Sequence, residues 1–187
     1  MQQLLDFDRH LFKLINSVWH HSFLDATLPL LRHQLIWTPL YFFMILYVLI
    51  NFKQNAWWWI IFAACLATLT NFVSSDLIKE NIFRLRPCND PTMADGLRVL
   101  VSYRPKSSSF TSSHATNHFG LAAFFFFTLH KRIGNRAYIF FVWAGIIIYA
   151  QVYVGVHYPL DVIFGGLVGF IFGYLSARSF NTNYPLA

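Results

Sequence analysis

The chain has 187 residues, of which 56% are hydrophobic and 19% aromatic, whereas only 12% are charged. A water-soluble domain is usually about 25% charged, so this composition excludes an ordinary soluble protein and predicts one domain surrounded by lipid. The net charge of +6 fits basic loops at membrane helix ends or an anionic ligand. No nucleic-acid motif accompanies it, so we expect no nucleic-acid partner.

The first part of the chain, residues 1–34, mixes apolar and charged side chains at helical spacing. This pattern predicts an amphipathic helix that lies in the membrane interface, followed by a second short segment at 23–31. Neither segment can cross a membrane, because a span needs about 20 apolar residues. The N-terminus carries acidic residues and lacks a basic stretch before an apolar core, so we expect no cleavable signal peptide.

Five longer apolar segments follow, at 35–52, 56–78, 112–129, 137–156 and 159–180. They predict an all-α, polytopic transmembrane helix bundle of about five spans with N-terminal interfacial helices. The expected organisation is an interfacial segment at 1–34, a membrane-embedded domain at 35–180 and a tail at 181–187.

The last predicted span carries small residues at intervals of four: Gly165, Gly169, Gly173 and Ala177. Small residues at this spacing let another helix approach closely. The partner helix could belong to the same bundle or to another subunit, so the oligomeric state stays open.

The loops predict how the chain is oriented in the membrane. The turn at 130–136 contains three basic residues and no acidic one, which places it on the cytoplasmic side by the positive-inside rule. The long loop at 79–111 and the junction between the last two spans then lie on the outer side. A long loop in a compact protein is often functional.

Polar residues gather at span ends on this outer side in three clusters, at 79–87, 107–114 and 151–161. The first cluster holds Lys79 and Arg86, a point charge and a planar fork that both suit phosphate oxygens. In the second cluster a helix is expected to begin at Ser112 and Ser113, where unpaired backbone N–H groups favour an anion. These features predict an anion site.

Two histidines and a carboxylate add reactive groups to the clusters. His114 and His157 can each move a proton or attack phosphorus, and Asp161 follows His157 by four residues, close enough to orient its imidazole. Any one of these side chains would more often be a membrane anchor, a helix cap or a solvated group. Ionisable groups are costly near a membrane, so their convergence from three chain regions favours a functional site.

A metal site is the alternative interpretation of these histidines. His114 and His118 stand at i and i+4, and His157 with Asp161 could complete a zinc shell. However, the segment lacks the glutamate of the zinc-protease helix, and the neighbouring lysine and arginine would repel a cation. We therefore expect neither a metal nor another cofactor.

The first two clusters resemble signature motifs of the type 2 phosphatidic acid phosphatase superfamily. The family's first motif, a lysine followed after six residues by Arg-Pro, is matched in full by Lys79 and Arg86-Pro87. Residues 111–114 keep the serine and the histidine of the second motif, Pro-Ser-Gly-His. The resemblance covers about residues 35–180.

The third cluster resembles the family's remaining motif, which is Ser-Arg, five residues, His, three residues and Asp, except that Ala150-Gln151 replaces Ser-Arg. His157 and Asp161 stand at the family spacing, but Gln151 replaces an arginine that clamps phosphate in the family. Losing a charge-assisted hydrogen bond would cost about 1–3 kcal/mol. We therefore expect compensation by a cation of the outer loop, with three candidates: Arg84, Arg104 and Lys106.

The resemblance implies a role for each matching residue. His157 would be the nucleophile that forms a phosphohistidine, Asp161 would orient it, and His114 would protonate the leaving oxygen and then activate water. The remaining residues would hold the phosphoryl oxygens: Lys79, Arg86, Ser112, Ser113 and Gln151. Such a site stabilises phosphoryl transfer by positioned charge without a metal.

The implied function is a membrane lipid phosphatase that acts on a phosphate monoester or diphosphate lipid. Its expected location is the bacterial cytoplasmic (inner) membrane, with the active site on the extracytoplasmic face and the bilayer and substrate lipid as partners. Undecaprenyl diphosphate is the first candidate substrate, ahead of phosphatidylglycerol phosphate, phosphatidate and lipid A. A lipid phosphotransferase and a non-catalytic phospholipid-binding or transport protein stay open as alternatives.

Overall fold

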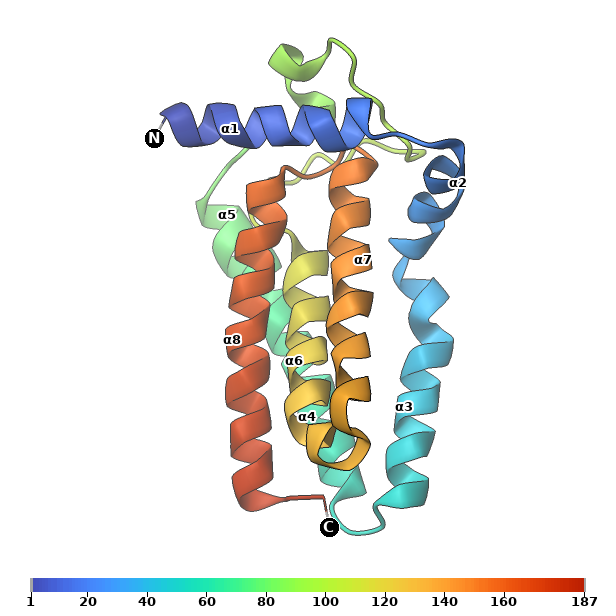
Figure 1. The fold of residues 1–187 in the computed structure, drawn as a ribbon. Coiled ribbons are helices and arrows are strands. Elements are labelled where there is room, and N and C mark those ends of the chain that lie inside the picture. Colours follow the sequence, from blue (N-terminus) through green and yellow to red (C-terminus); the bar gives the residue numbers. More distant parts are fainter. Residues whose placement is uncertain (1, 187) are drawn as a thin grey trace.

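The chain folds into a bundle of helices. The computed structural model describes residues 2–186, and this part of the chain contains no strand, which confirms the predicted all-α class. The helices are α1 (Gln2–Lys13), α2 (Ser22–Leu31), α3 (Thr38–Asn51), α4 (Ala56–Phe72), α5 (Lys79–Asn81), α6 (Ser113–Ile133), α7 (Ile139–Tyr153) and α8 (Pro159–Asn183). Figure 1 shows α3, α4, α6, α7 and α8 running alongside one another, with α1 lying across one end.

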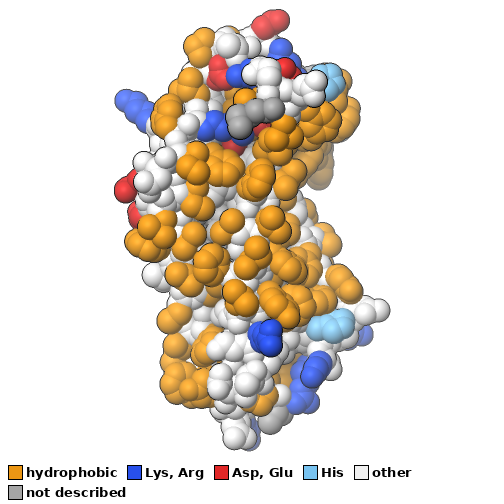
Figure 2. All heavy atoms as spheres, turned by 90° about the vertical axis from the view of Figure 1, so that its left-hand side faces the viewer, with side chains coloured by type: hydrophobic (Ala, Val, Ile, Leu, Met, Phe, Trp, Pro, Cys, Tyr) orange, Lys and Arg blue, Asp and Glu red, His pale blue; other side chains and the backbone are white. Residues whose placement is uncertain are grey.

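Four helical stretches are long and apolar enough to cross a membrane: Gln34–Asn51, Ala56–Asn81, Ser113–Tyr153 and Pro159–Asn183. The third folds back on itself at Gly134, whose φ of 60° suits glycine. It therefore supplies two antiparallel helices, α6 and α7, so five long helices run along the bundle (Figure 1) where the sequence predicts five spans. On the face in Figure 2, hydrophobic side chains cover the middle and charged ones gather toward the two ends.

The observed helix ends differ slightly from the predicted spans. α4 continues through a π-helical turn, Val73–Ile78, into α5, so the second stretch ends at Asn81 rather than at 78. α8 ends at Asn183 and so takes up the first three residues of the predicted tail at 181–187, of which residue 187 lies outside the described part. The last residues of the second stretch and of α8 have polar side chains, and hydropathy alone assigns such residues to loops.

The small residues of the last span pack α8 against α6, the most extensive helix pair of the bundle. A Cβ atom added to Gly169 would overlap the carbonyl oxygen of Thr116, and one on Gly173 would overlap that of Gly120. The backbones thus touch directly, as small-residue spacing allows. This stripe is used within the bundle, while the oligomeric state is a separate question.

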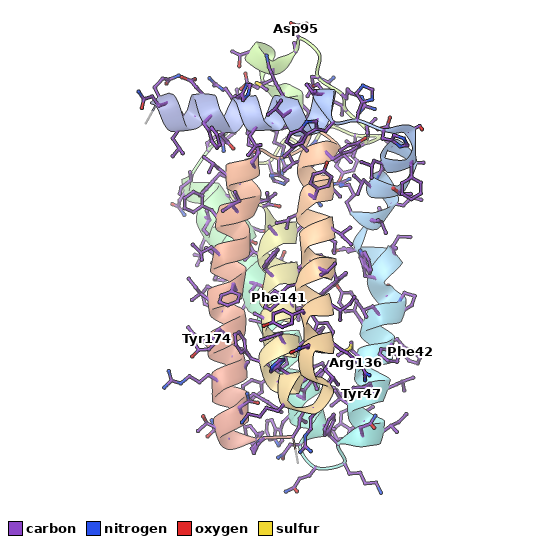
Figure 3. All side chains as sticks on the ribbon, in the orientation of Figure 1. Phe42, Tyr47, Asp95, Arg136, Phe141 and Tyr174 are labelled. Carbon is purple, nitrogen blue, oxygen red and sulfur yellow. The ribbon has the colours of Figure 1, made fainter. Side chains whose placement is uncertain are left out.

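The long loop at 79–111 and the turn at 130–136 are predicted to face opposite sides of the membrane. They lie at opposite ends of the molecule. Figure 3 places Asp95 of the long loop beyond α1 at one end and Arg136 of the α6–α7 turn toward the other. The end that carries Asp95 also carries all three polar clusters, and we call it the polar end.

Gly169→Ala should lower the melting temperature of the detergent-solubilised protein, because its methyl group would push α8 away from Thr116. Overpacking of this kind costs about 1–3 kcal/mol. Gly166→Ala is the matched control, since its methyl group would make only ordinary contacts with Phe119, at 3.4 Å or more. Equal melting temperatures for the two variants, measured by intrinsic fluorescence, would contradict the packing role.

Candidate active site

The nucleophile predicted from the sequence, His157, lies in the short junction between α7 and α8 and is only 2% exposed. Its Nδ1 atom is 3.7 Å from Oδ2 of Asp161 and 3.4 Å from Oγ of Ser109. Ser109 in turn donates a hydrogen bond of 2.5 Å to the same carboxylate oxygen. The carboxylate can therefore hold the imidazole partly through a serine hydroxyl, an arrangement that leaves Nε2 as the reactive atom.

Asp161 is fixed by the start of α8. Its Oδ2 atom accepts the backbone N–H of Tyr158 at 2.9 Å, which caps the helix. Capping uses a lone pair of the carboxylate to satisfy a backbone group at the helix end, and it holds the carboxylate in place. The helix start therefore sets the position of the group that faces His157.

Arg86 is held rigidly against the other side of His157. Its Nη1 atom is 3.0 Å from Nε2 of His157 and also donates to the carbonyl oxygen of Val156 at 3.1 Å. The rest of the guanidinium donates to the main chain and hydroxyl of Ser107 and to the carbonyl of Ser108. The planar fork thus stands where a phosphoryl group must arrive to meet Nε2.

Burial determines the protonation state of His157. Burial lowers the pKa of its imidazole to about 4, and the nearby charge of Arg86 acts in the same direction, although Asp161 opposes both. An imidazole with this pKa is neutral at neutral pH, and the neutral form is the one that can attack phosphorus.

Lys79 reaches the first turn of α6. Its Nζ atom donates to Oγ of Ser113 at 2.9 Å, and that hydroxyl also pairs with Ser75 at 2.9 Å. Ser112 instead caps the helix: its Oγ atom accepts the N–H of Ala115, and its own N–H donates to the carbonyl of Asp161. The structure therefore brings Ser113 next to Lys79, while both polar groups of Ser112 have helix partners.

His114 lies half-buried in the first turn of α6, and its imidazole has no hydrogen-bond partner within residues 2–186. It is close enough to Lys79 for the charge of the ammonium group to act on it. His118, one turn further along, is held by the carbonyl of His114 at 2.8 Å and by the hydroxyl of Tyr41 at 3.3 Å. His118 is thus occupied inside the bundle, whereas His114 faces the site.

The alternative of a metal centre finds no support in the arrangement of donors. In the described part of the chain, no three His, Cys, Asp or Glu side chains come together as a metal ion would require. The cations Lys79 and Arg86 occupy this space instead.

Two site residues, Asp8 and Ser109, were not predicted from the sequence. Asp8 comes from α1, is fully buried and accepts hydrogen bonds from Arg84 and from the N–H of Leu160. Arg84 also donates to Asp161 at 2.6 Å, so it joins two carboxylates. The only sequence signal is that Asp8 shares a helix face with the buried Phe12, four residues later.

In the described part of the chain, none of the three cations expected to compensate for Gln151 hydrogen-bonds to it, and their compensation at the phosphoryl group stays a prediction. Arg84 is engaged by Asp8 and Asp161, Arg104 donates to the carbonyl of Cys88 at 2.9 Å, and Lys106 is exposed. Gln151 itself is fully buried at the end of α7.

Comparisons with known proteins agree with these motifs. The model of the PAP2 superfamily matches residues 56–185. A relative described as a lipid A 4'-phosphatase, from Porphyromonas gingivalis, is 29% identical over 96% of this chain and 78% of its own length. Another with the same description, from Bacteroides thetaiotaomicron, is 31% identical over 92% of this chain and 76% of its own length.

Two solved structures share the fold. The crystal structure of Aquifex aeolicus LpxE aligns with a TM-score of 0.63 and 25% identity, covering 90% of this chain and 93% of that one. A PAP2-type phosphatidylglycerolphosphate phosphatase from Bacillus subtilis aligns with a TM-score of 0.72 and 20% identity, covering 97% and 88% of the two chains.

Asp8→Ala should destabilise the protein and lower its catalytic activity. Arg84 would lose one of its two carboxylate partners, and α8 would lose the carboxylate that accepts the N–H of Leu160. Breaking a buried ion pair typically costs about 3–5 kcal/mol. Asp6→Ala, on the exposed face of α1, is the control and should behave like the wild-type protein. A melting curve and phosphate-release rate for Asp8→Ala that match those of Asp6→Ala would refute this role for α1.

Proposed function

The chain belongs to the PAP2 superfamily. On that premise we propose that this integral membrane lipid phosphatase hydrolyses a phosphate monoester of a glycolipid of the lipid A class and releases inorganic phosphate. The observation that carries the proposal is the position of His157, with Arg86 against Nε2 and Ser109 and Asp161 on the side of Nδ1. This is the geometry of an oriented nucleophile beside a phosphate-binding fork.

In the proposed first step, Nε2 of His157 attacks phosphorus in line with the bond to the lipid oxygen. The N–P bond forms as the P–O bond breaks, and His114, which is protonated once the phosphate group lies beside it, gives its proton to the leaving lipid oxygen. The imidazole of His157 then carries a positive charge, which Asp161 stabilises through Nδ1. The products of this step are the dephosphorylated lipid and a phosphohistidine.

In the second step, the now neutral His114 takes a proton from a water molecule, whose oxygen attacks phosphorus. The N–P bond breaks, inorganic phosphate leaves, and His157 regains its neutral form. Lys79 and Arg86 would hold the phosphoryl oxygens through both steps, since charge fixed in advance lowers the barrier to phosphoryl transfer.

An apolar groove supports a lipid substrate. A cavity of about 420 Å³ lies between α3, α4 and α6, and most of its lining is apolar. Its polar lining includes Asn117 and His118, and His118 is one helical turn from His114. An acyl chain that lies in this groove would remain in the bilayer while its headgroup meets the polar end.

The relatives favour the lipid A class as substrate. Both curated relatives named above are lipid A 4'-phosphatases, and each aligns with more than nine-tenths of this chain. Undecaprenyl diphosphate, the first candidate from the sequence, stays a prediction. The basic turn at 130–136 supports placing the polar end on the extracytoplasmic face of a bacterial inner membrane.

The protein, reconstituted in lipid nanodiscs with EDTA present, should release inorganic phosphate from bisphosphorylated lipid A. His157→Gln should reduce this rate by about 10³-fold or more, because it removes the nucleophile. Undecaprenyl diphosphate, phosphatidylglycerol phosphate and phosphatidate complete the substrate panel, and mass spectrometry of the lipids identifies each product.

Three outcomes would count against the proposal. Full activity of His157→Gln would refute the mechanism. Phosphate release from another lipid of the panel but none from lipid A would refute the substrate class. Transfer of the phosphoryl group to an added acceptor lipid would favour the phosphotransferase instead.

A further inference from the structure

A largely buried cation at the polar end has no charged partner in the part of the chain that the structure describes. Arg32, which follows the last turn of α2, is only 8% exposed. Within residues 2–186 its side chain makes one hydrogen bond, from Nε to Oε1 of Gln151 at 3.3 Å, and no carboxylate lies within 4.0 Å of it. Both terminal nitrogens of the guanidinium are therefore without a protein acceptor in this part of the chain.

The other guanidinium groups near the site show how unusual this is. Arg84 has two carboxylate partners, and Arg86 has four oxygen acceptors besides His157. The terminal nitrogens of Arg32 are not among the fully enclosed atoms without a partner, so they face accessible space. An unpaired charge on a largely buried side chain favours binding of an anion there.

Arg32 also lies close to the reactive residues. Its charge acts on the imidazole of His114 and adds to the effect of burial in lowering the pKa of Arg86. The main-chain carbonyl of its partner Gln151 accepts the N–H of Val156, the residue before His157. Arg32 is thus connected to the junction that carries the nucleophile.

Gln151 itself is incompletely paired. It is fully buried, its Oε1 atom is taken by Arg32, and its Nε2 atom has no hydrogen-bond partner in the described part of the chain. A buried amide of this kind suits a group that orients a neighbour and donates one neutral hydrogen bond.

We infer that Arg32 is a substrate-binding residue, which supplies from the end of α2 the guanidinium that the third motif lacks at position 151. Gln151 is then a positioning residue, whose Oε1 fixes Nε of Arg32 and leaves both terminal nitrogens to bind phosphoryl oxygens. This inference rests on the proposed function, because it assigns a further ligand to the same phosphoryl group.

The docking of α2 supports this assignment. Asp25, in the middle of α2, accepts a hydrogen bond from the hydroxyl of Tyr153 at 2.6 Å and pairs with Arg98 at 2.5 Å. Tyr153 lies two residues after Gln151 on α7, so the same helix end fixes both α2 and the partner of Arg32. The position of Arg32 is therefore determined by two separate contacts between the α2 segment and α7.

The decisive experiment moves the guanidinium between the two helices. Arg32→Gln should lower kcat/KM about 10–100-fold and raise the inhibition constant for orthovanadate by a similar factor, as expected for a lost charge-assisted hydrogen bond. The double variant Arg32→Gln/Gln151→Arg should recover most of both losses, since it returns a guanidinium to α7. Gln151→Arg alone should be impaired, because it places two guanidinium groups side by side.

Matched variants isolate the contribution of Arg32. Arg136→Gln removes an exposed arginine at the opposite end and should leave both constants unchanged. Arg104→Gln and Lys106→Gln test the outer-loop cations. The inference would be overturned if either variant lowered kcat/KM and weakened orthovanadate inhibition while Arg32→Gln left both constants unchanged. Arg32→Lys, which keeps the charge but not the fork, should lie between the wild type and Arg32→Gln.

The result for Arg32 can be distinguished from that for the proposed function. If the wild type releases phosphate but Arg32→Gln has unchanged constants and a wild-type melting temperature, the inference fails and the proposed function stands. If the wild type releases no phosphate from any lipid, the proposed function fails, and calorimetry with orthovanadate still decides whether Arg32 binds an oxyanion. If Arg32→Gln does not fold, failure of the folded double variant to bind orthovanadate overturns the inference.

Discussion

Positive charge buried at the end of an apolar bundle is the constraint on which this structure depends. Among the cations of the site, Arg84 is neutralised by two carboxylates, those of Asp8 and Asp161. Lys79, Arg86 and Arg32 have no carboxylate within 4.0 Å in residues 2–186. Such an excess is costly without a counter-charge and complements the oxygens of a transferring phosphoryl group.

The fold meets this constraint by joining separate chain regions through short contacts. The glycines of α8 bring it against α6, and the N–H of Ser112 at the start of α6 then donates to the carbonyl of Asp161 in the first turn of α8. The two N-terminal helices are part of the same arrangement, since α1 supplies Asp8 and α2 leads into Arg32. The N-terminal segment thus contributes residues to the site.

The sequence was sufficient to predict the features that depend on local pattern. Apolar length identified the spans, and the spacing of Lys79, Arg86, His157 and Asp161 indicated a phosphate site. It could not identify partners that only tertiary packing brings together: Asp8 lies 76 residues from Arg84, and Arg32 lies 119 residues from Gln151. Compensation for Gln151 was expected from the outer loop, whereas the guanidinium that hydrogen-bonds to Gln151 is that of Arg32, directly after α2 and before the first span.

The phosphohistidine mechanism is tested most directly by locating the phosphoryl group during turnover. The protein would be mixed rapidly with lipid A labelled in its phosphate, quenched in alkali, which preserves phosphohistidine, and digested for mass spectrometry. Attack by His157 predicts the label on Nε2 of that residue. Label on His114 or on any other residue, or turnover with net inversion at phosphorus, would contradict it.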